Sequence, residues 1–183
     1  MALPSSSLGF VDTPPPPPPP LTLASLARRC ENKIQNPSFE YGVDPWLAMV
    51  SGSWATRGVY TSGGGGHQGS NFYYGHSNST VDSTLTISQS SISIPNGGQV
   101  ECAAWVASRR PGNIGSTRVE IFLDGQTCGI GYLGTTGWTR IAGKVSVSGD
   151  GAVHTLAVVA ISDEASEEGW QFWLDDLSVG VGC

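Results

Sequence analysis

Aromatic side chains on the polar faces of predicted strands are the residues best suited to recognise a ligand in this chain. The leading candidate is Trp105, which lies opposite the apolar positions of a predicted strand, with Ala103 and Ala107 leaving room beside it. A flat indole can stack on the apolar face of a sugar ring, and polar side chains can then hydrogen-bond to the sugar hydroxyls. These residue types therefore favour a carbohydrate as the ligand.

Further candidates come from neighbouring predicted strands and from loop edges. Glu120 and Arg118 lie on the polar side of the next predicted strand and are expected to supply hydrogen bonds. Tyr73 is expected to oppose whichever of Phe72 and Tyr74 belongs to the core. The remaining aromatic candidates, all at loop edges, are Trp54, Tyr132 and Trp170. For every one of these rings, packing in the core is the competing interpretation.

The elements that must position these side chains are short strands, because apolar residues alternate with polar ones in stretches cut by Gly, Ser, Asn and Thr. Turn signals such as Asn96-Gly97 and Asp124-Gly125 separate the stretches. The pattern predicts an all-β fold, an antiparallel β-sandwich of the jelly-roll type. The predicted strands are Gly52–Tyr60, Ser70–Gly75, Ser83–Ile94, Gln99–Ser108, Ser116–Leu123, Thr139–Val147, Val153–Ile161 and Gln171–Val179.

Composition excludes several classes of protein. Charged residues make up 13% of the 183 positions and the net charge is −6, which disfavours both a coiled coil and a protein that neutralises nucleic-acid phosphates. No apolar run approaches the roughly 20 residues that span a bilayer. Consecutive prolines from Pro14 to Pro20 predict a disordered segment over residues 1–29, followed by one domain over residues 30–183.

Four cysteines are an even number and fit two disulfides, although three pairings are possible. We expect Cys30 and Cys183 to clip the terminal strands together, and Cys102 and Cys128 to join neighbouring strands. Zinc is the competing interpretation, but no CxxC spacing is present. Disulfides imply an oxidising compartment and hence secretion, and the sequon at Asn78 predicts N-glycosylation.

Motifs at the two ends of the domain carry a resemblance to a known family. Asn36-Pro37-Ser38-Phe39-Glu40 opens the domain and Trp173-Leu174-Asp175-Asp176-Leu177-Ser178-Val179 closes it. Together with Asp44-Pro45-Trp46 and Gly137-Trp138-Thr139, they resemble carbohydrate-binding modules of the CenC-like group (families 4, 9 and 22), which implies a galactose-binding-like jelly roll. We assign Trp46 and Trp138 to packing because they belong to these scaffold motifs. Ligand-binding residues vary within the family, so none is transferred to this chain.

The same resemblance implies a structural calcium ion, held by the opening glutamate and by an aspartate of the closing strand. The matching positions are Glu40 and Asp175, and Asp176 is the adjacent acidic position. Carboxylates and loop carbonyls are hard oxygen ligands that suit Ca²⁺. Acidic strand ends without a metal are the alternative.

Two patterns suggest catalysis or cofactor binding. The residues from Gly129 to Gly134 match GxGxxG, but Thr135-Thr136-Gly137-Trp138 follows where a dinucleotide site needs a helix. Acidic residues precede Trp170 and offer a pair of carboxylates for glycoside hydrolysis, although a solvated loop explains them equally well. They are Asp163, Glu164, Glu167 and Glu168.

The sequence therefore predicts a secreted, monomeric, non-catalytic module that binds a polysaccharide or cell-wall glycan by stacking and hydrogen bonds. One alternative is a structural or adhesive secreted protein with the same fold and no sugar site. Another is a weak glycoside hydrolase or lyase built on the jelly roll.

Overall fold

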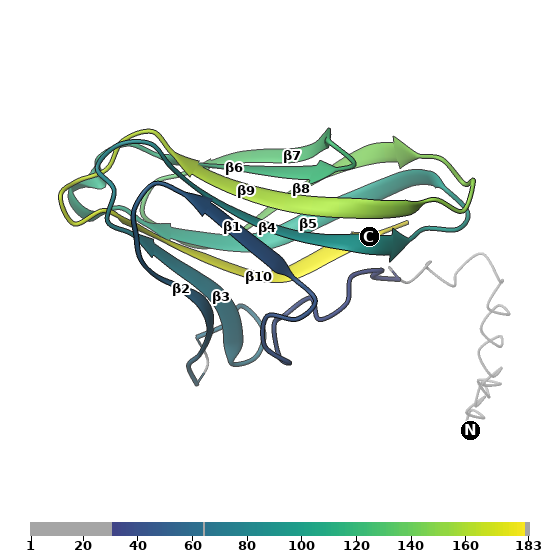
Figure 1. Ribbon diagram of the computed structural model, residues 1–183, viewed down its shortest axis with the longest axis horizontal. Coiled ribbons are helices and arrows are strands. Elements are labelled where there is room, and N and C mark those ends of the chain that lie inside the picture. Colours follow the sequence, from purple (N-terminus) through teal and green to yellow (C-terminus); the bar gives the residue numbers. More distant parts are fainter. Residues whose placement is uncertain (1–30, 64, 182–183) are drawn as a thin grey trace, which may run out of the picture.

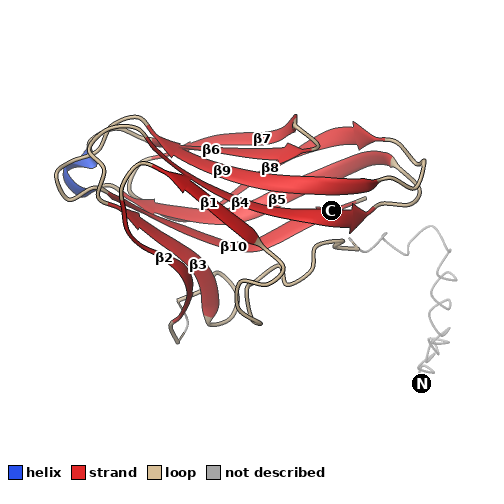
Figure 2. Cartoon of the chain, viewed as in Figure 1, coloured by secondary structure: helices blue, strands red, loops and turns tan. Residues whose placement is uncertain are grey.

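The computed structural model describes residues 31–63 and 65–181, which form two packed β-sheets (Figures 1 and 2). A short 3₁₀ helix, Pro111–Asn113, joins the fifth strand to the sixth. The disorder predicted for residues 1–29 and the Cys30–Cys183 disulfide lie outside the described residues. The strands are β1 (Leu47–Ser51), β2 (Trp54–Thr61), β3 (Asn71–Ser77), β4 (Ser83–Ser93), β5 (Gly98–Arg109), β6 (Thr117–Leu123), β7 (Gln126–Leu133), β8 (Thr136–Val147), β9 (Val153–Ser162) and β10 (Trp170–Gly180).

Each sheet has five strands, and all the paired neighbours run antiparallel. Sheet A has the order β1-β4-β9-β6-β7, and sheet B has the order β2-β3-β10-β5-β8. Figure 1 shows the two sheets lying one over the other, with β5 and β10 beneath β4 and β9. The antiparallel β-sandwich expected from the sequence is confirmed.

The core lies between the sheets and follows the two-residue alternation. On β5, the residues predicted to share the apolar side are fully buried and point inward, and they are Val100, Cys102, Ala104 and Val106. The partner positions on β9 and β10 do the same, with at most 1% exposure for Leu156, Val158, Ala160, Phe172 and Leu174. Trp105 therefore faces outward from sheet B, as the alternation predicts.

Two strands were not among those expected from the sequence: the short β1 and the glycine-rich β7. Glycine on β7 and β8 allows the edges of the two sheets to touch, since a Cβ on Gly143 would lie 1.5 Å from the Cys128 carbonyl oxygen. A Cβ on Gly131 would lie 2.6 Å from Ile141. The GxGxxG match thus belongs to a strand at a close sheet-to-sheet contact, and not to a phosphate-binding loop.

A disulfide joins Cys102 on β5 to Cys128 on β7, so this predicted pairing is confirmed. The two strands belong to opposite sheets, whereas the sequence suggested strands that are simply neighbours. The bond closes a chain segment with a sequence separation of 26, for which the loop-entropy model gives roughly 3 to 4 kcal/mol of stabilisation. It crosses the core and links the layers directly.

The opening segment of the domain packs along the closing strand. The backbone N–H of Lys33 donates to the Val179 carbonyl, and the Asn32 side chain bonds to backbone groups of Leu177 and Val179. Phe39 and Trp46 are buried and contact each other, so Trp46 is a packing residue as expected. Within residues 31–63 and 65–181, no helix has the length and apolarity to cross a bilayer.

Candidate functional site

An aromatic row crosses the outer face of sheet B. It consists of Tyr60 on β2, Tyr74 on β3 and Trp173 on β10, with ring centroids 5.1 Å and 5.3 Å apart along the row. Tyr74 pairs directly with Trp173 in the sheet register, and Trp173 pairs with Ala107. The small side chain of Ala107 leaves the far edge of the Trp173 ring open. Rings fixed on a paired sheet form a rigid apolar surface.

A shallow pocket of about 430 Å³ continues this row on the same face. The rings of Trp173 and Trp138 line it, and Ala107 also contributes. The other lining residues are Gly65, Ser108, Arg109, Thr135, Thr136 and Gly137. Indole surface, hydroxyl groups and one guanidinium group thus meet in an open depression, which is the usual composition of a small-ligand site.

Trp138 departs from the sequence interpretation, which assigned it to packing. It is half-buried, lines the pocket and belongs to β8, the edge strand of sheet B. Its ring lies on the outer face of sheet B, outside the core between the two sheets. A motif that the sequence interpretation assigned to the scaffold therefore contains a residue of the candidate site.

Segment 65–70, the part of the β2–β3 connection that begins at Gly65, folds back over the same face. The imidazole of His67 stacks on Trp105 with a centroid distance of 3.7 Å, and it meets Trp138 edge-on at 6.0 Å. Trp105 therefore lies on the predicted face, half-buried, with one side of its ring covered by His67. No sequence pattern predicted this covering segment, because glycine-rich stretches have no periodicity.

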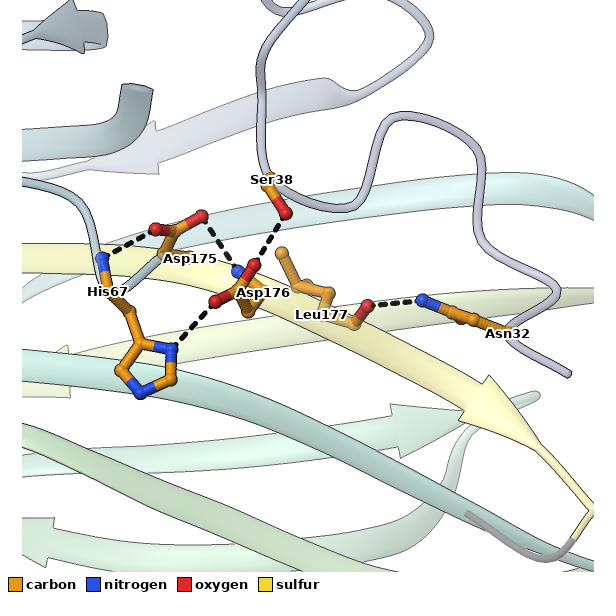
Figure 3. A network of polar contacts seen from close by, with 6 residues as sticks. All are labelled: Asn32, Ser38, His67, Asp175, Asp176 and Leu177. Carbon is orange, nitrogen blue, oxygen red and sulfur yellow. Dashed lines mark hydrogen bonds and ion pairs between the residues drawn. The ribbon is translucent and has the colours of Figure 1, made fainter. Parts of the chain in front are cut away.

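Two aspartates of β10 hold segment 65–70 in place (Figure 3). The His67 backbone N–H donates to Asp175 Oδ2 at 2.7 Å, and His67 Nδ1 lies 2.6 Å from Asp176 Oδ2. Asp176 also accepts a hydrogen bond from the Ser38 hydroxyl. A bulge in β10, where Asp176 has a positive φ of 44°, allows both carboxylates to face the segment.

Asp175 is fully buried, and burial raises the pKa of its carboxyl to about 6. Hydrogen bonds from the backbone N–H groups of Asp176, His67 and Gln68 act in the opposite direction. No basic side chain among the described residues forms an ion pair with Asp175. A buried anion stabilised by amide groups alone has the chemistry to accept a cation.

The expected calcium ligands lie on two sides of the same segment. Glu40 Oε1 is 3.4 Å from the backbone N of Asn71, and Asp175 contacts His67 as described above. Within the described part of the chain, no three His, Cys, Asp or Glu side chains converge as a metal site. An ion held by Glu40 and Asp175 would need backbone or amide oxygens as its other ligands, and this all-oxygen chemistry fits Ca²⁺.

Two predicted binding residues are corrected by their burial. Tyr73 is 1% exposed and packs against Phe39, while Trp170 is fully buried and donates from its Nε1 to Ser83 Oγ. In each case the neighbouring position of the strand carries the outward side chain. Trp54, half-buried at the sheet edge, packs edge-on against Trp170 and is not among the residues that line the pocket.

The other three predicted contacts lie on the wrong sheet to join Trp105. Arg118 and Glu120 belong to β6 of sheet A, where they form an ion pair at 3.3 Å. Tyr132 on β7 is 68% exposed and pairs with Arg118 in the register. The consecutive strands β5 and β6 lie in opposite sheets, which the local alternation pattern does not encode, so these residues cluster away from the pocket.

Asn78 and the acidic loop occupy other parts of the surface. Asn78 is exposed after β3, and its side-chain oxygen accepts a hydrogen bond from Ser53. The acidic side chains of the β9–β10 connection are exposed, and the Glu164 backbone carbonyl accepts from the buried Arg110 guanidinium. This loop is thus anchored by its backbone, and its carboxylates extend into solvent.

No protein-family model matches the chain, and no curated protein matches it. Among solved structures, a family 61 carbohydrate-binding module in complex with β-1,4-galactotriose is similar at 20% identity, covering 81% of this chain and 97% of that chain with a TM-score of 0.59. A family 22 xylan-binding domain is similar at 19% identity, covering 83% and 96% with a TM-score of 0.53.

An enzyme chain also contains a similar module. The xylanase 10B of Clostridium thermocellum, with its family 22 and catalytic modules complexed with xylohexaose, is 13% identical with a TM-score of 0.54. That match covers 78% of this chain and 27% of the xylanase chain, so it concerns one part of a larger enzyme. These likenesses confirm the jelly-roll fold of carbohydrate-binding modules.

Proposed function

We propose that this domain binds a carbohydrate chain in the pocket on the outer face of sheet B, with Trp173 and Trp138 as stacking surfaces. The observation that carries the proposal is the open depression bounded by these two indoles and continued by Tyr74 and Tyr60. The fold supports it, because similar modules were crystallised with galactotriose or are described as xylan-binding.

The chemistry of the pocket suits a sugar better than a flat aromatic ligand. Pyranose rings have apolar faces of C–H groups and an edge of hydroxyls, so they combine stacking on Trp173 with hydrogen bonds to groups such as Thr136 and Arg109. Affinity is modest, because each sugar hydroxyl exchanges a bond with water for a bond with protein.

The module binds without cleaving, and it acts outside the cell. The carboxylates of Asp175 and Asp176 hold segment 65–70, Glu40 accepts a hydrogen bond from the Asn71 backbone N–H, and the pocket lining lacks a paired acid and base among the described residues. The Cys102–Cys128 disulfide supports an oxidising compartment. A calcium ion at Glu40 and Asp175 would stabilise the frame of the site without touching sugar.

The test compares rings on the two sheets. Trp173→Ala and Trp138→Ala are measured beside Tyr132→Ala, the matched control that removes an exposed ring from sheet A. A glycan array identifies the ligand, and titration calorimetry gives affinities. We expect each tryptophan variant to bind about 30-fold more weakly, the effect of losing a central aromatic contact of about 2 kcal/mol.

The control should bind like the parent protein, and all variants should keep the parent circular dichroism. Undiminished binding in both tryptophan variants would refute the proposed site. If the parent protein bound no glycan on the array, the structural or adhesive alternative would replace it.

A further inference from the structure

The pocket contains a single charged side chain among its described lining residues, and that side chain is a cation. Arg109, at the end of β5, is exposed and points from the outer face of sheet B. No Asp or Glu is among the described residues that line the pocket. A local positive site on a protein of net charge −6 is the feature that requires an explanation.

Three of the five described arginines have partners within the protein, whereas Arg109 and Arg57 have none among the described residues, and of these two only Arg109 lines the pocket. Arg118 pairs with Glu120, Arg140 pairs with Glu101, and the buried Arg110 bonds to hydroxyl and carbonyl groups. No ion pair or side-chain hydrogen bond joins Arg109 to another described residue. Its guanidinium group is therefore available to a ligand.

The position of Arg109 places its charge along the aromatic row. The pKa of Tyr74 is raised by burial and by Tyr60, and the positive charge of Arg109 acts on it in the opposite direction. Arg109 also pairs with Gln171 in the sheet register, two residues from Trp173. A sugar stacked on Trp173 would thus have this cation at its edge.

We infer that the pocket selects an acidic sugar, a hexuronate within a glycan chain, whose carboxylate pairs with Arg109. This inference rests on the proposed carbohydrate-binding function. The carboxylate of a pyranose uronate projects sideways from the ring, so it reaches a cation beside the stacking surface while the ring stays flat on the indole. The planar guanidinium can hold both carboxylate oxygens, which a neutral sugar cannot offer.

The net negative charge of the protein further limits which acidic glycans can bind. Glycans with a carboxylate on every unit would be repelled by the net charge of −6, since screening at physiological salt extends over about 8 Å. The single cation of the pocket matches a single acidic unit. The inferred ligand is therefore a largely neutral chain that carries isolated uronate residues.

The experiment uses the full chain and three oligosaccharide probes of equal length. They are a xylo-oligosaccharide bearing one glucuronate, its carboxyl-reduced derivative and a galacturonate oligomer, all titrated by calorimetry at two salt concentrations. We expect the reduced derivative to bind about tenfold more weakly than the glucuronate probe, the loss of one charged hydrogen-bonded pair. The galacturonate oligomer should bind more weakly than the glucuronate probe.

Arg109→Gln should abolish the preference for the carboxylate, so that the glucuronate probe and its reduced derivative bind with similar affinity. Arg57→Gln is the matched control, because it removes the same charge from another exposed arginine of sheet B that does not line the pocket. Equal affinities of the parent protein for the acid and its reduced derivative, or no binding of the acid, would overturn the inference.

Comparing Trp173→Ala with Arg109→Gln separates sugar binding at the site from its preference for a carboxylate. If Trp173→Ala weakens binding of every probe but Arg109→Gln changes nothing, the pocket binds sugar without reading charge. If Trp173→Ala has no effect, the proposed site itself is wrong. A sulfated oligosaccharide that binds more tightly than the glucuronate probe would also overturn the assignment of a carboxylate.

Discussion

Sheet B presents aromatic rings on both faces, and adjacent residues of the same strands supply them. On β3, Tyr73 packs against Phe39 in the core while Tyr74 contacts Trp173 outside. On β10, Phe172 is buried and Trp173 borders the pocket. A shift of one residue therefore decides whether a ring stabilises the fold or is free to meet a ligand.

The largest expected effect comes from the inner face. Trp170→Ala should lower the free energy of unfolding by about 3 to 5 kcal/mol, because a fully buried ring and its hydrogen bond to Ser83 are lost. Trp173→Ala, on the outer face, should lower it by about 1 kcal/mol or less. Urea denaturation measures both.

Trp170→Phe keeps a ring in the core and allows the comparison if the alanine variant does not fold. Similar losses of unfolding free energy for Trp173→Ala and Trp170→Ala would contradict the different roles assigned to the two faces of sheet B.

Removal of calcium should have the next largest effect on stability. The expected ion lies at the outer face of sheet B, where segment 65–70 crosses Asp175. If Glu40 and Asp175 hold the ion, saturating calcium at about 100 times its Kd contributes about 2.7 kcal/mol, and EDTA should lower Tm by several degrees. Differential scanning calorimetry with and without EDTA measures it. Glu40→Gln should abolish the shift of Tm on adding EDTA. An unchanged Tm in the parent protein would show that no calcium ion stabilises the fold.

His67→Ala should have a smaller effect on stability and a clear effect on the solvent exposure of Trp105. It removes the ring stacked on Trp105 and the contact with Asp176, a loss of about 1 kcal/mol. One face of Trp105 becomes open, so acrylamide should quench the tryptophan fluorescence more strongly. His76→Ala, which removes an imidazole from the same face, should leave quenching as in the parent.

The alternation of apolar residues predicted much of this fold. It located eight of the ten strands to within a few residues, and it placed Val100 inward and Trp105 outward on β5. The same rule would have placed Trp173 outward, since Phe172 and Leu174 on either side are apolar and buried. The aromatic run from Phe72 to Tyr74 has no such contrast, so the sequence could not decide which ring enters the core.

The candidate site depended on features that are not local in the sequence. The assignment of β6 to sheet A separates Arg118 and Glu120 from Trp105, and strand pattern alone does not report which sheet a strand joins. His67 reaches Trp105 because two carboxylates of β10 hold its segment, a contact across more than a hundred residues of chain. Packing between distant segments, more than propensity, positions the site.

The smallest effect is expected at the β6–β7 turn, which belongs to sheet A. Burial alone would raise the pKa of Asp124, but hydrogen bonds from His154 and from the Thr155 backbone N–H outweigh it and hold the pKa below its usual value. This pair therefore contributes stability above the unfolded-state pKa of about 3.9, and the contribution is lost as pH falls through the lower folded-state value.

Asp124→Asn should consequently destabilise the protein slightly at pH 7, and the difference from the parent should disappear near pH 2. Thermal melts across this pH range measure it, with glycan binding at pH 7 unchanged. A difference that grows toward low pH would have the wrong sign for this pair.

The Cys102–Cys128 bond has a consequence for recognition. It fastens β5, the strand that carries Trp105 and ends at Arg109, to sheet A, so the two sheets cannot slide past each other. Much of the entropic penalty of arranging the contact surface is thereby met during folding, before any sugar arrives. A preorganised surface of this kind would hold a saccharide longer under oxidising conditions than after reduction, even where both forms remain folded.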